Sequence, residues 1–238
     1  TIEQTLEPGL DGTATFCEND APSNLFLSLG GTPNSGGTWT PALNSGSGLF
    51  DPSIDVAGIY TYTLAGTTIC PAVSATVAVT INPLLEAGTN GTALFCNSAS
   101  LSDLFTYLGG NPDVGGIWTP SLASGTGVFN PAVDAAGAYT YTVSGTTSCP
   151  IDTATVTVTI EQSLNPGING NAIFCSNDAS LDLFTKLGGT PNLGGTWSPA
   201  LNSGTGIFDP SIDVAGIYTY TLAATTTCPA VSATVTVT

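Results

Sequence analysis

The sequence predicts an all-β fold built from three copies of one small domain. Three observations lead to this prediction. The tryptophans Trp39, Trp118 and Trp197 recur at intervals of 79 residues. Between them, short stretches of alternating apolar and hydroxylic residues are separated by Gly and Pro, which is the pattern of half-buried strands joined by turns. Each copy also contains two cysteines, always 53 residues apart.

A nearly identical segment shows the repeat most clearly. Residues 50–64 read FDPSIDVAGIYTYTL, and residues 208–222 read the same letters. The copies join at TVAVT–INP and TVTVT–IEQ, so we expect domains at residues 1–80, 81–159 and 160–238. A period of this length is typical of an independent domain, not of a solenoid repeat. We therefore expect three tandem domains with the same role.

The strands are expected from two-residue alternation in each copy. Residues 59–64 place Tyr60, Tyr62 and Leu64 on one apolar face, and residues 74–81 alternate in the same way. A short helix is expected before the tryptophan, most clearly in ASLDLFTKLGG, with Ser180 as its N-cap and Gly188 as its stop.

Six or seven short strands with one cysteine pair and one tryptophan favour a two-sheet sandwich of the immunoglobulin type. We expect each tryptophan to fill the core beside a disulfide. The alternative is an exposed platform on which a sugar stacks.

An aspartate stands at the same corner of every copy, immediately before the Tyr-rich strand. These residues are Asp55, Asp134 and Asp213. Asp favours tight turns because its carboxylate accepts backbone N–H groups. We expect a structural role at this corner, and a metal-binding or catalytic role is the alternative.

The cysteines predict a disulfide in every domain. Six cysteines allow fifteen pairings, and the repeat favours Cys17–Cys70, Cys96–Cys149 and Cys175–Cys228. Such bonds require an oxidising compartment outside the cytoplasm. Zinc is the rival ligand, but the cysteines are not in close pairs and the chain has no His.

Composition and charge argue against several classes of function. Acidic residues number 17 against one base, Lys186, which gives a net charge of −16. This charge repels nucleic-acid and anionic lipid phosphates, so we expect neither as a partner. Gly and Pro interrupt every long apolar stretch, so we expect no membrane insertion. Without His the usual Ser and Cys hydrolase arrangements are absent, and we expect no enzyme activity.

Calcium is the cofactor that deserves consideration, because the chain is rich in carboxylates. Candidate ligands are Glu18, Asp20, Asp51 and Asp55, although the other copies do not keep all of them. The pair Asp51 and Asp55 could also act as acid and base, but the middle copy has Asn130 in the first place. A solvated acidic surface without a cofactor is the expected state.

Two modification signals occur once each. Asn90-Gly91-Thr92 fits an N-glycosylation sequon. Asp152-Thr153-Ala154 resembles the O-glycosylation signal of exported Bacteroidota proteins, which would modify Thr153.

The segments GGTWTPAL, FDPSIDVAGIYTYT, CP and ATVTVTI together resemble the tandem repeats of giant cell-surface adhesins of Bacteroidota. Such adhesins are exported by the type IX secretion system and include gliding-motility adhesins. The repeats are more loosely similar to PKD-like and other bacterial immunoglobulin-like modules.

This resemblance implies an extracellular location on the bacterial outer surface and a stalk or filament that supports attachment or gliding. Its partners would be neighbouring repeats of the same long chain, and surface polysaccharide or other cells. Thr1 and Thr238 occupy equivalent positions of the repeat, so we expect the sequence to be part of a longer protein. A glycan- or calcium-binding module and a subunit of a self-assembling fibre or sheath are the alternatives.

Overall fold

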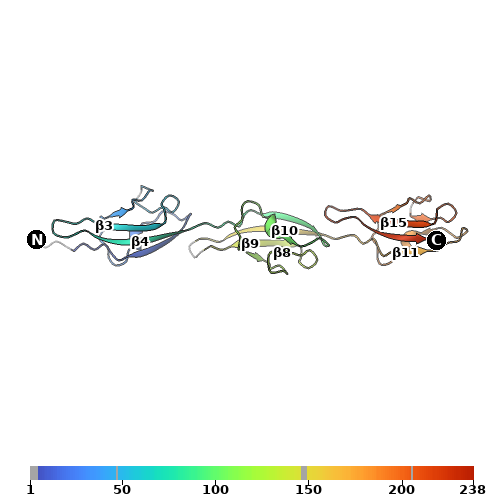
Figure 1. The fold of residues 1–238 in the computed structure, drawn as a ribbon, viewed down its shortest axis with the longest axis horizontal. Coiled ribbons are helices and arrows are strands. Elements are labelled where there is room, and N and C mark those ends of the chain that lie inside the picture. The colour runs from blue at the N-terminus through green and yellow to red at the C-terminus, as the bar shows by residue number, and fades with distance from the viewer. Residues whose placement is uncertain (1–4, 47, 146–148, 205) are drawn as a thin grey trace. The chain divides into compact units, whose positions relative to one another are not determined.

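The computed structural model describes residues 5–46, 48–145, 149–204 and 206–238. Over these residues, every regular element is a strand or a four-residue 3-10 helix (Figure 1). The elements of the first repeat are β1 (Gly12–Cys17), η1 (Leu25–Ser28), β2 (Thr38–Thr40), β3 (Gly58–Leu64) and β4 (Val73–Asn82). Those of the second are β5 (Gly91–Cys96), β6 (Ser102–Asp103), η2 (Leu104–Tyr107), β7 (Ile117–Thr119), β8 (Val128–Phe129), β9 (Gly137–Val143) and β10 (Asp152–Glu161). Those of the third are β11 (Gly170–Ala172), β12 (Leu181–Asp182), η3 (Leu183–Lys186), β13 (Thr196–Ser198), β14 (Ile207–Phe208), β15 (Gly216–Leu222) and β16 (Val231–Val237). The predicted all-β class is confirmed.

Each repeat contains one four-stranded sheet with the same strand order. The orders are β1-β4-β3-β2, β5-β10-β9-β7 and β11-β16-β15-β13. The first strand of each repeat runs parallel to the last. In the first and third repeats the remaining neighbours are antiparallel. A thinner second layer contains the two-residue ladders β6–β8 and β12–β14.

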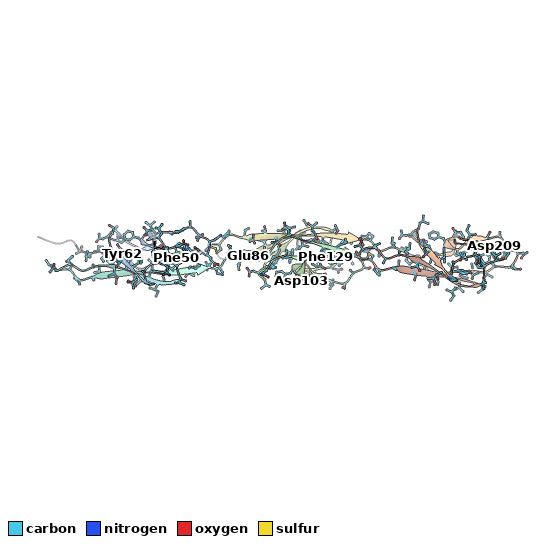
Figure 2. All side chains as sticks on the ribbon, turned by 90° about the horizontal axis from the view of Figure 1, so that it is seen from above. Phe50, Tyr62, Glu86, Asp103, Phe129 and Asp209 are labelled. Atoms are coloured by element: carbon cyan, nitrogen blue, oxygen red, sulfur yellow. A yellow bond between two sulfur atoms is a disulfide. The ribbon has the colours of Figure 1, made fainter. Side chains whose placement is uncertain are left out.

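The alternating strands place their apolar residues as the sequence predicts. In β3, Tyr60, Tyr62 and Leu64 are buried, and Tyr60 lies opposite Val77 of β4. The inner face then packs against Phe50 (Figure 2), which is fully buried. The Phe50 ring lies edge-on to that of Tyr60. The third repeat builds an equivalent core.

A tyrosine at the start of the central strand ties the corner to the sheet. The Tyr60 hydroxyl donates to the carbonyl of Val56 at 2.9 Å. The same bond recurs in the other repeats, from Tyr139 and from Tyr218. A tyrosine bonded to the backbone a few residues upstream is a hallmark of immunoglobulin-like sandwiches. With the sheet order, it identifies the fold as tandem immunoglobulin-like sandwiches.

The short helix differs in kind and in cap from the prediction. In the third repeat it is the single 3-10 turn η3, capped by Asp182, whose carboxylate accepts the N–H of Phe184 at 2.9 Å. Ser180 is therefore not the N-cap. The turn ends at once because Leu187 returns to extended backbone and is buried in the core.

The described residues pack into two compact units. One comprises Thr1–Thr89, Gly110–Ile117 and Tyr141–Ala154, and the other comprises Asn90–Gly109, Trp118–Thr140 and Thr155–Thr238. The middle repeat contributes to both units. A division into three domains at residues 80 and 159 stays a prediction.

Candidate functional site

The structure corrects the predicted disulfides. Cys17 is bonded to Cys149, and Cys96 is bonded to Cys228, each across a sequence separation of 132 residues. The predicted pairs 17–70, 96–149 and 175–228 are therefore wrong. Each bond joins the first cysteine of one repeat to the second cysteine of the next. Each also lies within one of the two compact units.

The strand arrangement explains why cysteines of one repeat do not meet. Cys17 ends β1 and lies beside Asn82, at the far end of β4. Cys70 precedes the other end of β4, which begins at Val73. The nine residue-to-residue steps from Val73 to Asn82 separate these ends by about 30 Å. A disulfide requires Cα atoms within about 7 Å, so Cys17 can only reach a cysteine near Asn82.

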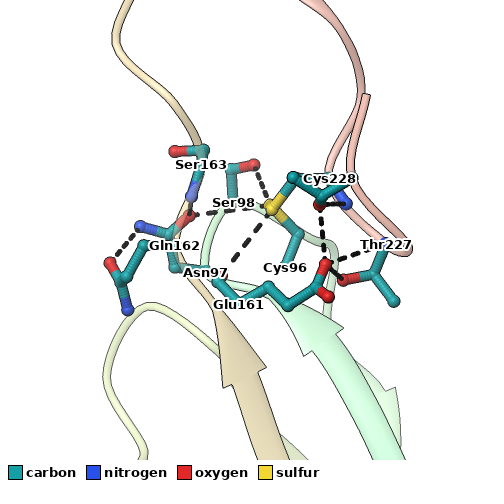
Figure 3. The surroundings of a disulfide bond; sticks show 9 residues. Cys96, Asn97, Ser98, Glu161, Gln162, Ser163, Thr227 and Cys228 are labelled. Carbon is teal, nitrogen blue, oxygen red and sulfur yellow. Dashed lines mark hydrogen bonds between the residues drawn. A yellow bond between two sulfur atoms is a disulfide. The ribbon is translucent and has the colours of Figure 1, made fainter. Parts of the chain in front are cut away.

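Glu161 is the charged residue of the second junction, which we define as Cys96, Cys228 and the residues around them. Its carboxylate accepts a hydrogen bond from the Thr225 hydroxyl at 2.7 Å. It accepts another from the Thr227 hydroxyl at 2.8 Å (Figure 3). The backbone N–H of Thr227 donates to it as well, at 3.0 Å. These bonds, led by that of Thr225, lower the pKa of Glu161 below its ordinary value. The carboxylate is therefore held in its charged form beside the disulfide.

Asn97 fastens the other side of the same junction. Its N–H extends the β5–β10 ladder by donating to the carbonyl of Glu161 at 2.9 Å. Its side-chain oxygen accepts the N–H of Ser163 at 3.0 Å, and its amide donates to Gln162 at 2.9 Å (Figure 3). Three hydrogen bonds thus join Asn97, the residue after Cys96, to the end of β10 and the two residues that follow it.

The first junction, around Cys17 and Cys149, has the same backbone arrangement but lacks the carboxylate of Glu161. Glu18 donates its N–H to the carbonyl of Asn82 at 3.0 Å. Asp20 accepts the N–H of Cys17 at 2.7 Å and so shapes the turn that carries this cysteine. Asn82 occupies the repeat position of Glu161. An amide therefore stands where the second junction has a carboxylate.

The remaining two cysteines are free thiols. Cys70 is half-buried and Cys175 is exposed. Their counterparts in the two disulfides are all buried, with at most 8% of the residue exposed. The difference shows that a completed junction covers its cysteines.

The corner aspartates accept backbone hydrogen bonds in all three repeats. Asp213 takes the N–H of Asn202 at 2.6 Å on one oxygen and the N–H of Asp209 at 2.8 Å on the other. Asp55 bonds Asn44 and Asp51 in the same way. Asp134 bonds the N–H groups of Ala123 and Asn130. Both oxygens of each corner carboxylate are occupied by the fold.

The corner carboxylate also acts on its neighbouring tyrosine. Burial is the main cause that raises the pKa of Tyr60, and the negative charge of Asp55 adds to it. The same two causes raise the pKa of Tyr139 and of Tyr218. Each hydroxyl therefore stays protonated and donates its hydrogen bond over a wide pH range.

Three of the four candidate calcium ligands, Asp20, Asp51 and Asp55, accept local hydrogen bonds. Asp20 bonds Cys17, and Asp51 accepts from the N–H and the hydroxyl of Ser53. Asp55 bonds the corner as described. Within the described residues, no three His, Cys, Asp or Glu side chains are grouped so that they could hold a metal ion. Calcium binding stays a prediction without a built site.

The tryptophans are half-buried, and Trp39 and Trp197 pack on tyrosines. Trp39 lies 5.1 Å from Tyr62, and Trp197 lies 5.2 Å from Tyr220, measured between ring centroids. Trp118 is also half-buried. Trp39 pairs with Tyr62, which lies opposite Ala75, whereas Cys17 lies beside Asn82. The indole therefore sits well along the sheet from the disulfide that Cys17 forms.

One modification signal begins just before a strand, and the other lies on a strand. Asn90 is exposed just before β5, and its side-chain oxygen accepts the N–H of Thr155 at 2.8 Å. Thr153 is exposed on β10. Glycosylation at either residue stays a prediction. Among the described residues, no helix is long and apolar enough to cross a membrane.

No protein-family model matches the chain, and none of the curated proteins matches it. Among solved structures it is similar to an I-band fragment of titin, with 12% identity, a TM-score of 0.43 and coverage of 96% of this chain and 97% of that one. Sidekick-1 immunoglobulin domains 1–4 are similar with 13% identity, a TM-score of 0.30 and coverage of 98% of this chain and 75% of that one. Extracellular domains 3–5 of Drosophila OTK are similar with 14% identity, a TM-score of 0.29 and coverage of 98% of this chain and 97% of that one. These likenesses are remote, and the sheet order and tyrosine corner carry the fold assignment.

The junction residues are the functional residues that sequence reasoning missed. Glu161, Asn97 and Thr227 differ from their counterparts in other repeats, so no repeated motif marks them. Their common signal is position: each stands within two residues of a cysteine or at the end of the last strand.

Proposed function

We propose that this chain is a structural segment of a secreted adhesive protein, which holds an adhesive region away from a bacterial cell surface. The observation that carries the proposal is the covalent bond from each repeat to the next. A disulfide that joins consecutive repeats resists their separation under tension, whereas one within a repeat would only hold that repeat closed. Attachment and gliding both pull on the molecule that anchors the cell.

The chemistry of the residues supports a structural role. The corner carboxylates and tyrosine hydroxyls are engaged with the backbone, and Glu161 is engaged with threonines. Disulfides persist in oxidising surroundings outside the cytoplasm, which supports an extracellular location. The bacterial surface and type IX export rest on the resemblance of the repeats.

The proposal is tested on intact cells and with coated beads. An antibody against the purified chain should label cells of the producing bacterium without permeabilisation. Beads coated with the chain should bind surface polysaccharides and other cells no better than beads coated with albumin. Labelling only after permeabilisation would overturn the surface location. Specific binding by the beads would replace the stalk role with that of an adhesive module.

A further inference from the structure

The two free thiols belong to two incomplete copies of the same junction. Each junction has two halves: a strand-end half, such as Cys17 or Cys96, and a loop half, such as Cys149 or Cys228. Cys175 is a strand-end cysteine that has no loop partner, and Cys70 is a loop cysteine that has no strand-end partner. Their repeat positions are those of cysteines that are bonded elsewhere in the chain.

The loop half at Cys70 already has the bonded conformation. Thr67 donates its N–H to the carbonyl of Cys70 at 2.8 Å, and the N–H of Cys70 returns to the Thr67 hydroxyl at 3.0 Å. In the completed junction, Thr225 and Cys228 make the same two bonds, at 3.0 and 3.1 Å. The loop therefore needs no rearrangement to present its thiol.

The turn at Cys175 has the conformation of a bonded one, although β11 itself ends three residues earlier, at Ala172. The N–H of Cys175 donates to Asp178 at 2.6 Å, and the N–H of Asp178 donates to the carbonyl of Cys175 at 3.0 Å. The bonded Cys17 makes equivalent contacts with Asp20, at 2.7 and 3.0 Å. The loop at Cys70 and the turn at Cys175 thus match the corresponding parts of completed junctions.

Both thiols lie beside apolar side chains. Cys175 lines an open pocket of about 170 Å³ in which Phe174, Phe208 and Val237 lie together with polar residues such as Asp213 and Thr238. The Cys70 loop carries Ile69, which is 75% exposed. The apolar part of the pocket lining gives Ile69 a surface to contact when the two halves meet.

We propose that Cys70 and Cys175 are the acceptor and donor halves of further junctions, each completed by another repeat of this type. A second copy of this chain can supply that repeat, with its Cys175 bonded to Cys70 of the first. Because each copy then retains one free half of each kind, the reaction continues from copy to copy. The proposal rests on the junction geometry and does not depend on the adhesive role.

The bond forms by thiol–disulfide exchange with a small disulfide, such as oxidised glutathione. The Cys175 thiolate attacks the small disulfide and forms a mixed disulfide, releasing one small thiolate. The Cys70 thiolate of the second copy then attacks the Cys175 sulfur and displaces the other small thiolate. The two protein thiols lose two electrons and two protons, and the small disulfide gains them as two thiols.

The test uses the whole chain with single substitutions. Cys70→Ser leaves only Cys175 free, and Cys175→Ser leaves only Cys70 free. Each variant is incubated with oxidised glutathione, alone and as an equimolar mixture, and products are separated on a non-reducing gel. The mixture should form a reducible dimer roughly tenfold faster than either variant alone, which corresponds to ~1.4 kcal/mol of selectivity. The unsubstituted chain should form a ladder of longer products.

A matched control separates docking from simple thiol coupling. The triple variant Cys70→Ser, Cys175→Ser and Leu193→Cys moves the strand-end thiol to a residue that is 80% exposed and outside the junction. Mixed with Cys175→Ser, it should form the mixed dimer no faster than either variant dimerises alone. A rate equal to that of the matched pair would show that exposure of the thiol is enough, and would overturn the proposal. An unsubstituted chain that stays monomeric would overturn it as well.

Discussion

At the residue scale, short polar side chains do most of the shaping, and they do so through the backbone. The corner aspartates each bond two backbone N–H groups. Asp11 begins β1 in the same manner, because its carboxylate accepts the N–H of Thr76 at 2.7 Å, and this bond lowers its pKa. The carboxylates that looked like candidates for chemistry are therefore structural acceptors.

Replacing a corner aspartate should destabilise its repeat. Asp213→Ala leaves the N–H groups of Asn202 and Asp209 without their acceptor in a part-buried site. We expect the free energy of unfolding to fall by roughly 2–4 kcal/mol, measured by urea denaturation under non-reducing conditions. Asp209→Ala is the control, because among the described residues that carboxylate bonds only the exposed Ser211, and its effect should be under about 1 kcal/mol. Equal losses for both variants would contradict the role of the corner.

Acid should weaken the second junction through Glu161. The pKa of Glu161 lies below its ordinary value of 4.5 because the folded state bonds the charged form. Its contribution to stability is therefore complete above 4.5 and is lost as the pH falls through the lowered folded pKa. Thermal unfolding of the protein and of Glu161→Gln should differ at neutral pH and converge in acid. A difference that does not change with pH would show that the charge is not involved.

At the element scale, close contacts between the first strand and the 3-10 helix fix where glycine is required. A Cβ on Gly170 would lie 1.8 Å from the backbone oxygen of Lys186, and a Cβ on Gly91 would lie 1.8 Å from that of Tyr107. The glycines of the Asp11-Gly12, Asn90-Gly91 and Asn169-Gly170 pairs are thus sites of close backbone approach. If the strand and the 3-10 helix moved apart, the leucine that follows the helix would lose its buried position in the core.

Gly170→Ala should therefore be costly where another glycine is not. The added methyl meets backbone and forces β11 away from η3, so we expect a loss of about 1–3 kcal/mol. Gly216→Ala in the same repeat is the matched control, because an added Cβ there would meet no atom within 4 Å and its φ is not positive. It should be neutral or slightly stabilising. Chemical denaturation of both variants gives the comparison.

The strands were predictable from the sequence, whereas the disulfides were not. Tyr60, Tyr62 and Leu64 alternate with threonines, and that period alone fixes a half-buried strand and its inner face. The cysteine spacing is different in kind, because a perfect repeat gives the same pattern whether Cys17 bonds Cys70 or Cys149. Only the parallel pairing of β1 with β4 places Cys17 and Cys70 at opposite ends. No residue pattern in the sequence indicates that pairing.

At the scale of the whole molecule, two long covalent loops replace three short ones. The loops closed by Cys17–Cys149 and Cys96–Cys228 each span 132 residues. On the chain-entropy model, a loop of this length stabilises the folded state by roughly 5 kcal/mol. The two contributions are not additive, because both loops include residues 96–149 and constrain the same part of the unfolded chain.

Proteolysis distinguishes the two pairings directly. Leu84→Lys places a trypsin site in the exposed linker between the first two repeats, in addition to Lys186. After thiol alkylation and digestion in denaturant, fragments 1–84, 85–186 and 187–238 should stay joined until a reductant is added. Release of fragment 1–84 before reduction would restore the pairing within repeats.

Mechanical extension should be limited by the shortest covalent path. That path runs from Thr1 to Cys17, crosses to Cys149, returns to Cys96 and crosses to Cys228. It contains about 80 residues, so the oxidised chain should reach ~270 Å and the reduced chain ~800 Å in single-molecule pulling. Cys70→Ser should leave the oxidised limit unchanged, and Cys17→Ser should lengthen it. An increase with Cys70→Ser would mean that this cysteine is bonded.

The overlap of the two loops has a further consequence for an exposed protein. Every peptide bond between Cys17 and Cys228 lies inside at least one ring closed by sulfur. A single severed bond in that span therefore releases nothing, and damage must strike twice before any piece can depart. Release of a fragment from this span therefore requires at least two cleavages.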